Sequence, residues 1–322
     1  MMRVRPCRHA VRLLLVLSSA APSGKAALAQ GGTDILLAPL RGTGDALSIG
    51  DPVNLTRRVG YDNQPSFTPA SDALLYTTID DAGQADIRII RNVESMPAGA
   101  GAGAGEWLIR TSPESEYSAT VMPNGRIAVV RVEADSTQRL WSFTREGGEP
   151  RLVFDELQPV GYFAWADSTM AALFILGEPP TLQLADTRSG AARVVAAAIG
   201  RSLQKIPARR AISFIQHVPE LGSWVVELDV ATGALRRLVR TLDGAEDHTW
   251  TPDGTLLMGR GSRLFAWDPR AGSPLGDDAT AWRELADLAD AGVVGITRLA
   301  VSPDGRWLAL VAEDQDSATR DD

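Results

Sequence analysis

The chain consists of short stretches in which apolar and polar side chains alternate, each bounded by a polar turn. In "TLLMGR" (255–260) and "RWLALVA" (306–312) an apolar run follows directly on a Pro-Asp-Gly turn. "GSWVVELDVATG" (222–233) alternates in the same way and ends in a turn with glycine. Runs of this length, bounded by Gly and Pro, predict strands joined by tight turns. With 30 glycines and 19 prolines in 322 residues, the pattern predicts an all-β fold.

The strand–turn–strand pattern recurs six times. Good copies are "HTWTPDGTLLMGR" (248–260) and "RLAVSPDGRWLALVA" (298–312), whereas "YFAWADSTMAALFIL" (162–176) has alanine in place of the proline. The turns are centred on positions 69, 123, 166, 207, 252 and 303, so their intervals are 54, 43, 41, 45 and 51 residues. Periods of roughly 40–50 residues are typical of repeats that each form one four-stranded sheet.

Two further strand-like segments follow each turn motif and give four strands per unit. In the fifth unit these are "SRLFAWDPRAG" (262–272) and part of 277–292, where a short helix is an equal alternative. The last unit lacks both, and the N-terminal segments 33–42 and 52–58 match the missing strands. We therefore expect a six-bladed β-propeller of four-stranded antiparallel blades, closed by pairing of N-terminal strands with the last blade. A β-sandwich is the alternative, but it does not require six matched sets of strands.

The first 29 residues have the layout of a secretory signal peptide. Four arginines precede the apolar "LLLVLSSAA" (13–21), and "ALAQ" (27–30) supplies a small-x-small cleavage site. The apolar run is shorter than the roughly 20 residues of a membrane span. Cleavage before Gln30 removes five basic residues and the only cysteine, Cys7, which takes the formal net charge from −8 to −13. The mature chain then has no disulfide, and an uncleaved N-terminal anchor is the alternative.

These segments define the expected domains and location. We expect a signal peptide at 1–29, a propeller at 30–316 and a disordered acidic tail at 317–322. The protein is then exported to the periplasm or the extracellular space, with no transmembrane segment after cleavage. Lys and Arg are not clustered in the body of this acidic chain, so a nucleic-acid partner is not expected.

The repeats resemble those of the TolB-like six-bladed propellers, a family with WD-like β-propeller repeats. The resemblance rests on the Ser/Thr-Pro-Asp-Gly turns at 251–254 and 302–305 with the apolar strand after each, and it spans residues 33–312. TolB has an additional N-terminal α/β domain, for which no room precedes the first strand here, so the chain is similar to a free-standing propeller. The motif is specific for the fold and not for a function.

The Pro-Asp-Gly residues have a sufficient structural explanation. Proline presets φ at the first corner of a turn, aspartate bonds back to the local backbone, and glycine accepts a positive φ. By resemblance to the family, these turns lie on the face away from the usual binding funnel. We therefore expect Asp253 and Asp304 to stabilise turns, and we assign no catalytic residue.

The loops of the opposite face place aromatic and charged side chains around the central opening. This mixture suits a peptide or sugar partner, although ordinary solvated loops have a similar composition. The candidate ligand- or partner-binding residues are Arg58, Tyr61, Asp62, Glu116, Tyr117, Tyr162, Glu246, Asp247 and His248.

Neither a metal nor another cofactor is expected. Residues 246–248 combine Glu, Asp and His, but adjacent residues rarely converge on one metal, and "DDAGQAD" (80–86) lacks the spacing of a calcium loop. The Gly-x-Ser-x-Gly elbow of α/β-hydrolases does not occur. The enzyme alternative is a lactonase-type propeller, which binds a metal at the central opening through residues from several blades.

The sequence thus predicts a monomeric, non-catalytic scaffold that binds a protein or peptide in the periplasm or cell envelope. A metal-dependent hydrolase of the lactonase kind is the first alternative. A propeller with a purely structural role is the second.

Overall fold

The computed structural model describes residues 32–93, 105–111, 113–270 and 281–314. These residues form β-strands and turns, with short 3-10 helices at Gly44–Ala46 (η2) and Ala289–Ala291 (η5). None of the helices in these ranges has the length and apolar character that a bilayer span requires. The predicted signal peptide (1–29) and acidic tail (317–322) lie outside the described residues and stay predictions.

Four sheets contain four strands each, and successive strands pair antiparallel. Because short turns join the strands, each strand pairs with the next one along the chain. The strands of these sheets are β8 (Ser115–Val121), β9 (Ile127–Val132), β10 (Gln138–Phe143) and β11 (Arg151–Leu152); β12 (Val160–Trp165), β13 (Met170–Ile175), β14 (Thr181–Asp186) and β15 (Ala192–Ala197); β16 (Ile199–Lys205), β17 (Ala211–Val218), β18 (Gly222–Asp229) and β19 (Leu235–Arg240); and β20 (His248–Trp250), β21 (Leu256–Arg260), β22 (Arg263–Trp267) and β23 (Arg283–Asp287). In the segment 277–292, where the sequence left helix and strand open, the described residues form β23 and η5.

The other strands form one nine-stranded sheet with two parts. The first part is a meander of β4 (Tyr61–Phe67), β5 (Ala73–Ile79), β6 (Ala85–Arg91) and β7 (Glu106–Ile109), and the second contains β24 (Arg298–Val301), β25 (Trp307–Glu313), β1 (Thr33–Arg41), β2 (Ser48–Ile49) and β3 (Val53–Asn54). β1 pairs antiparallel with β25, from Thr33 opposite Glu313 to Pro39 opposite Trp307, and β3 pairs with β1. One parallel bridge between Thr33 and Tyr61 joins the two parts. The N-terminal strand thus lies in the same sheet as the last strand of the chain.

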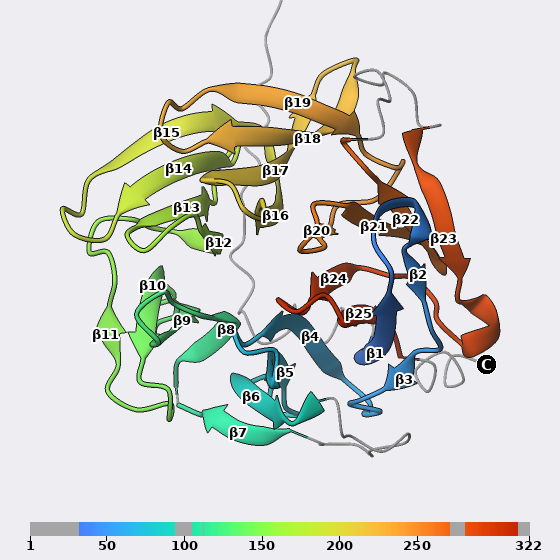
Figure 1. Cartoon of the computed structure of the whole chain (residues 1–322). Helices are drawn as coiled ribbons and strands as arrows, with labels where there is room; N and C mark the ends of the chain where they lie inside the picture. Colours follow the sequence, from blue (N-terminus) through green and yellow to red (C-terminus); the bar gives the residue numbers. More distant parts are fainter. Residues whose placement is uncertain (1–31, 94–104, 112, 271–280, 315–322) are drawn as a thin grey trace, which may run out of the picture.

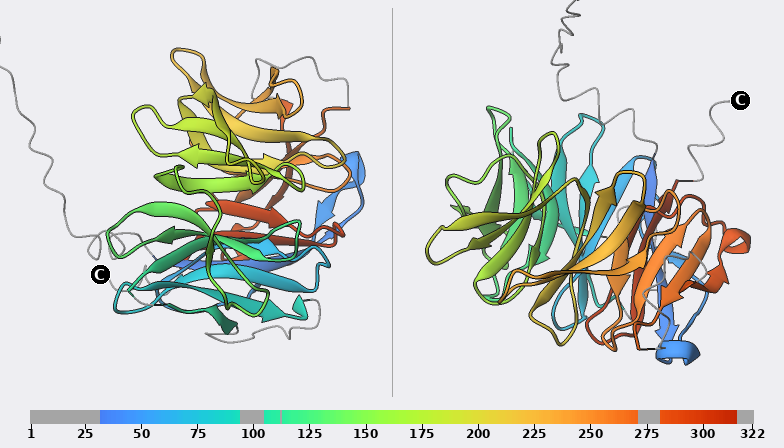
Figure 2. Two further views of the ribbon diagram at one scale, coloured as in Figure 1. Left: turned by 90° about the vertical axis from the view of Figure 1, so that its left-hand side faces the viewer. Right: turned by 90° about the horizontal axis from the view of Figure 1, so that it is seen from above.

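The sheets are arranged around a common axis like the blades of a propeller (Figure 1). In each four-stranded sheet, and in each part of the nine-stranded sheet, one strand lies innermost. These innermost strands are β4, β8, β12, β16, β20 and β24. Seen from the side, the strands run between two faces on which the turns gather (Figure 2). We call the face with the turns between first and second strands the turn face, and the opposite face the funnel face.

Buried apolar side chains lie between neighbouring sheets instead of at one common centre. In β25, Leu308 and Leu310 join the cluster that contains Leu257 of β21, while Ala309 and Val311 join the cluster that contains residues of β5. Successive side chains of a strand point to opposite faces of the sheet. The apolar residues of "RWLALVA" therefore pack alternately against the two neighbouring sheets. Burial of one leucine side chain contributes about 2 kcal/mol to the free energy of folding. A strand in a sheet that is covered on both faces buries apolar side chains on both sides and is stabilised by both.

The Pro-Asp-Gly segments form the turns that the sequence predicts. The Asp253 carboxylate accepts hydrogen bonds from the Thr251 and Thr255 hydroxyls, from the Gly44 amide (3.2 Å) and from Arg270 Nη2 (2.8 Å). The Asp304 carboxylate accepts bonds from the Ser302 hydroxyl and from the backbone and side chain of Arg306. Gly254 and Gly305 have φ of 90° and 74°, which favours glycine. Both carboxylates are therefore fully occupied in holding turns.

Candidate functional site

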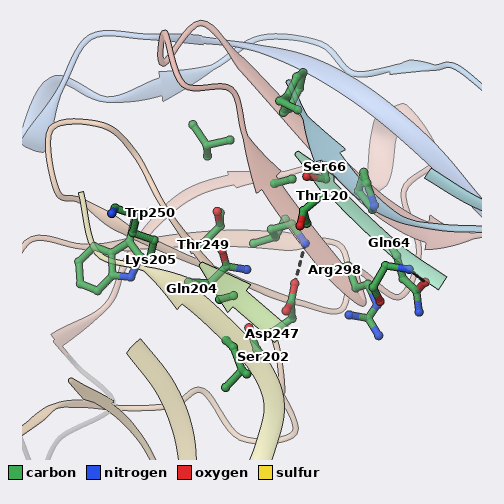
Figure 3. Close-up of a pocket in the computed structure, with 18 of the residues that line it drawn as sticks. Gln64, Ser66, Thr120, Ser202, Gln204, Lys205, Asp247, Thr249, Trp250 and Arg298 are labelled. Atoms are coloured by element: carbon green, nitrogen blue, oxygen red, sulfur yellow. Dashed lines mark hydrogen bonds between the residues drawn. The ribbon is translucent and has the colours of Figure 1, made fainter. Parts of the chain in front are cut away.

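A channel of about 480 Å³ runs along the axis between the innermost strands (Figure 3). Its wall near the funnel face contains Tyr162, Arg201, Asp247 and Arg298. At the turn face it is lined by three of the repeated prolines, Pro207, Pro252 and Pro303. Between the two ends, hydroxyl and amide side chains alternate with aromatic rings, and those labelled in Figure 3 are Gln64, Ser66, Thr120, Ser202, Gln204, Thr249 and Trp250.

A second cavity of about 1020 Å³ opens at the funnel face beside the channel. It shares Gln64 and Tyr162 with the channel, and Tyr61 and Tyr117 also line it. Burial raises the pKa of Tyr61 to about 12, with smaller opposing effects of Arg298 and other neighbours. Burial also raises the pKa of Tyr117. All three tyrosines offer rings and hydroxyls to a ligand.

Gln64 is held in place where the two cavities meet. Its side-chain oxygen Oε1 accepts hydrogen bonds from the Thr77 hydroxyl (2.8 Å) and from the Ser118 backbone amide (2.8 Å). Gln64 and Ser118 both have positive φ, 58° and 55°. Gln64 lies at a β-bulge or irregularity in the pairing of β4 with β5, and Ser118 lies at one in the pairing of β8 with β9. Left-handed backbone in non-glycine residues costs of order 1–3 kcal/mol and is concentrated at functional sites. The bulges therefore shape the wall of this opening at some expense in stability.

The channel lining has more positive than negative charge, although the whole chain is acidic. Among the described residues, Arg201, Lys205 and Arg298 are its cationic side chains, and Asp247 is its one carboxylate. Lys205 donates a hydrogen bond to the Ala166 carbonyl, toward the turn face. The Asp247 carboxylate accepts a bond from the Leu299 amide (2.7 Å), and burial raises its pKa in spite of the attraction of Arg298 and Arg201.

Several of the sequence-predicted residues come together at this opening. Tyr61 and Tyr117 line the larger cavity, Asp247 lines the channel, and Tyr162 lines both. Glu246 lines a small adjoining cavity of about 120 Å³, where its carboxylate lies 4.0 Å from Arg201 Nε. These five residues, from four different connections of the chain, surround one entrance.

Arg58 and Asp62 engage each other instead of the opening. Arg58 Nη2 lies 3.1 Å from Asp62 Oδ1 and also donates to the Thr78 hydroxyl and two backbone carbonyls. Asp62 is buried and lines neither of the two cavities at the opening. This pair therefore fastens the start of β4 to its neighbours.

Glu116 is also absent from the cavity walls. It is buried, its Oε1 lies 2.9 Å from Arg131 Nε, and the Thr111 hydroxyl donates to it. Its second oxygen has no hydrogen-bond partner among the described residues. Burial raises the pKa of Glu116 to about 7, because the contacts with Thr111 and Arg131 offset only part of the desolvation.

The expectation that His248 lines the opening is corrected by its position. The ring is fully buried, and its Nε2 lies 2.7 Å from the Ser213 hydroxyl, which also accepts a bond from Trp250 Nε1 (2.8 Å). Burial lowers the pKa of His248 to about 3, so the ring is neutral. Because His248 is the first residue of β20, its side chain points between two sheets, whereas Asp247 next to it points into the channel.

Sequence reasoning missed Gln64, Arg201 and Arg298, since it considered chiefly the loops before the innermost strands. These three residues lie in the strands themselves, where side chains alternate between the channel and the sheet interior. A usable signal was present in the sequence. Arg298 interrupts the apolar "VVGITRLAV" (293–301), and Arg201 interrupts "AIGRSL" (198–203).

The described residues contain no group of three or more His, Cys, Asp or Glu side chains placed to hold a metal ion. In the channel itself, the only carboxylate stands beside two arginines. A divalent cation there would be repelled by the guanidinium groups and would find few negatively charged oxygen ligands. The arrangement suits binding of a neutral or anionic ligand better than metal-assisted hydrolysis.

Comparison with known proteins identifies the fold. No protein-family model matches the sequence, and no curated protein is significantly similar to it. Among solved structures, a putative TolB from Agrobacterium tumefaciens has a TM-score of 0.63 at 13% identity, with coverage of 88% of this chain and 99% of that one. TolB from Acinetobacter baumannii has a TM-score of 0.52 at 11% identity, with coverage of 87% of this chain and 64% of that one. A gluconolactonase from Xanthomonas campestris has a TM-score of 0.57 at 10% identity, with coverage of 85% of this chain and 95% of that one. The chain is therefore similar in fold to TolB-like and other propellers, and such low identities carry no function with them.

Proposed function

We propose that the chain is a six-bladed TolB-like propeller, at residues 30–316, whose ring is closed by the N-terminal strands. The pairing of β1 with β25 and of β3 with β1 supports this, because it completes a four-stranded blade from both ends of the chain. The single bridge between Thr33 and Tyr61 then marks the border between the last blade and the first. A blade shared by the two ends prevents the ring from opening.

Deletion of residues 33–58 tests this closure. We expect the deletion to abolish cooperative thermal unfolding, because β25 loses its partner and the last blade loses two of its strands. A synthetic peptide of residues 33–58, added in trans, should restore the transition, whereas a scrambled peptide should not. A deletion variant with an unchanged melting transition would contradict the closure.

We further infer that the protein is an exported scaffold that binds a peptide or a protein segment at the funnel face. The observation that carries this function is the joined opening, in which the channel and the larger cavity meet at Gln64 and Tyr162. Tyrosine side chains and many hydroxyl and amide groups suit the backbone and side chains of an extended peptide. Export is supported by the basic, apolar and small-residue pattern of residues 1–29.

A plug in the channel tests the binding function. Ala164 lines the channel, so Ala164→Trp would fill it, while Val194→Trp places the same side chain on the exposed outer strand β15. Peptides selected from a synthetic library on the chain from residue 30 onward should bind Ala164→Trp at least tenfold more weakly than the wild type. The Val194→Trp control should bind them normally, and both variants should keep the wild-type melting temperature. No selectable peptide, or equal binding by the plugged variant, would refute the function.

A metal-dependent hydrolase of the lactonase kind is the second candidate, because a gluconolactonase is among the proteins that share the fold. Metal analysis of the purified protein separates the two. One divalent ion per chain that is lost in Glu246→Gln or Asp247→Asn would favour the hydrolase, whereas the scaffold requires no such ion.

A further inference from the structure

Arg298 lines the channel without an ion pair among the described residues. Its Nη2 donates one hydrogen bond, to the Tyr162 hydroxyl (3.0 Å), and its guanidinium carbon lies 5.0 Å from the centre of the Tyr162 ring. No carboxylate of the described residues lies within the 4.0 Å of an ion pair with it. Tyr162 therefore fixes the position of the guanidinium without cancelling its charge, and four of the five guanidinium N–H groups have no acceptor in the part of the chain that the structure describes.

Arg201 lies near Arg298, and its guanidinium group also has N–H groups without an acceptor among the described residues. Both arginines line the channel and the small adjoining cavity, together with Asp247. The Arg201 side chain donates no hydrogen bond within the described residues, and its buried Nε has no partner. Its nearest carboxylate is that of the half-exposed Glu246, at 4.0 Å, where an exposed ion pair contributes little.

Cations that leave water without a partner cost several kcal/mol, and protein interiors ordinarily pair them. Of the two carboxylates near the two arginines, Glu246 is half-exposed and lies at the limit of an ion pair with Arg201, and Asp247 already accepts a bond from the Leu299 amide. A ligand carboxylate at this point would supply acceptors for the guanidinium N–H groups of Arg201 and Arg298 that have none among the described residues. The planar guanidinium group binds carboxylates in a bidentate manner, so two of them provide a site of the right shape.

The rest of the channel restricts the anion to a single charge on an otherwise uncharged ligand. Beyond the arginines the walls carry hydroxyl, amide, aromatic and apolar groups, which suit peptide bonds and neutral side chains, and the one further cation, among the described lining residues, is Lys205, which is bonded to the Ala166 carbonyl. The whole chain has a formal charge of −8, which repels polyanions such as nucleic acids.

We propose that Arg201 and Arg298 form a carboxylate-binding subsite, which holds one carboxylate of an extended peptide segment at the mouth of the channel. This inference rests on the proposed peptide-binding function and names the group that the site recognises. The carboxylate comes either from the C-terminus of the peptide or from an acidic side chain.

Three short probes test the subsite on the chain from residue 30 onward, by calorimetric titration. They are N-acetylated trialanine with a free carboxylate, the same peptide with an amidated end, and an N-acetylated, amidated tripeptide with glutamate at its centre. At least one of the two acidic probes should bind ten times more tightly than the neutral one. The tighter acidic probe identifies the source of the carboxylate.

Variants locate the effect. Arg298→Met and Arg201→Met should each remove most of the discrimination between acidic and neutral probes, and Arg298→Lys should retain part of it. Arg145→Met is the matched control, because Arg145 is an exposed arginine on the turn face with no ion pair among the described residues. It should leave the discrimination unchanged.

Two results would overturn the subsite. One is equal affinity of the acidic and neutral probes, or no binding by any of them. The other is discrimination that survives in the double variant Arg201→Met/Arg298→Met. If library peptides nevertheless bind and the channel plug blocks them, the peptide-binding function stands and only the subsite is wrong.

Discussion

The Pro-Asp-Gly turns and the mouth of the channel both carry charged side chains, but the two regions differ in how these charges are neutralised. On the turn face, Asp253 and Asp304 each accept several hydrogen bonds and lie within 2.8 Å of an arginine nitrogen. In the channel, considering only the described residues, the Arg298 side chain donates a single hydrogen bond and that of Arg201 donates none.

The difference distinguishes charged residues that stabilise the fold from charged residues that are available to bind a ligand. A charge whose partners lie in its own turn and in the loops packed against that turn is explained by the stability of those loops. A guanidinium group in a cavity, with N–H groups that have no acceptor among the described residues, leaves hydrogen-bond donors available to a ligand. The repeated motif, which is the most conspicuous feature of the sequence, therefore belongs to the first class, and two isolated arginines belong to the second.

The largest expected effect concerns Glu116, which lies near the funnel face and is only partly neutralised by Arg131. Its pKa rises from the ordinary value of 4.5 to about 7 on folding, so the folded state binds a proton more tightly than the unfolded state. The contribution of Glu116 to the free energy of unfolding should therefore be fully present below about pH 4.5, and its loss, on the order of 3 kcal/mol, should be complete once the pH has risen past 7. Urea unfolding at a series of pH values measures this.

Two substitutions isolate the contribution of Glu116 from those of other groups. Glu116→Gln should remove the decrease in stability between about pH 4.5 and pH 7, whereas Glu149→Gln, at an exposed carboxylate, should leave that decrease as in the wild type. A Glu116→Gln curve parallel to that of the wild type would show that this carboxyl does not titrate on folding.

A smaller loss is expected at the turn face. Asp253→Ala removes the acceptor for Thr251, Thr255, Gly44 and Arg270, which should lower the free energy of unfolding by about 1–2 kcal/mol. Asp253→Asn keeps part of the hydrogen bonding and should cost less. Denaturant unfolding of both variants provides the measurement, and unchanged stability of Asp253→Ala would remove the distinction between the two regions.

The smallest effect on stability is expected in the channel. Arg298→Met replaces an unpaired guanidinium with an apolar side chain of similar length, so the free energy of unfolding should stay within about 0.5 kcal/mol of the wild type or rise. Arg131→Met is the contrasting variant, because it leaves Glu116 buried without its cation and should cost about 3 kcal/mol. If Arg298→Met destabilised the protein as much, Arg298 would be a structural residue.

Much of the fold was predictable because its signals are local. The turn at 302–306 requires proline, aspartate and glycine in order, and the strand after it requires apolar residues on both faces. The match of residues 33–42 and 52–58 to missing strands of the last unit anticipated the pairing of β1 with β25 and β3. The candidate site was only partly predictable, since Tyr61, Tyr117, Tyr162, Glu246 and Asp247 were found but Gln64, Arg201 and Arg298 were not.

His248 illustrates the physical limit. Asp247 and His248 are adjacent and both polar, yet one lines the channel and the other is buried against Ser213. In a strand a shift of one residue exchanges the two faces, so composition cannot decide which neighbour reaches the ligand.

The sequence by itself determined the all-β repeat, the turns and the strands, because each depends on residues within about fifteen positions of one another. Only the tertiary structure decided which side chains share the channel. Arg201 and Arg298 are brought together by the packing of separate sheets around one axis, and that packing leaves several of their N–H groups without an acceptor among the described residues.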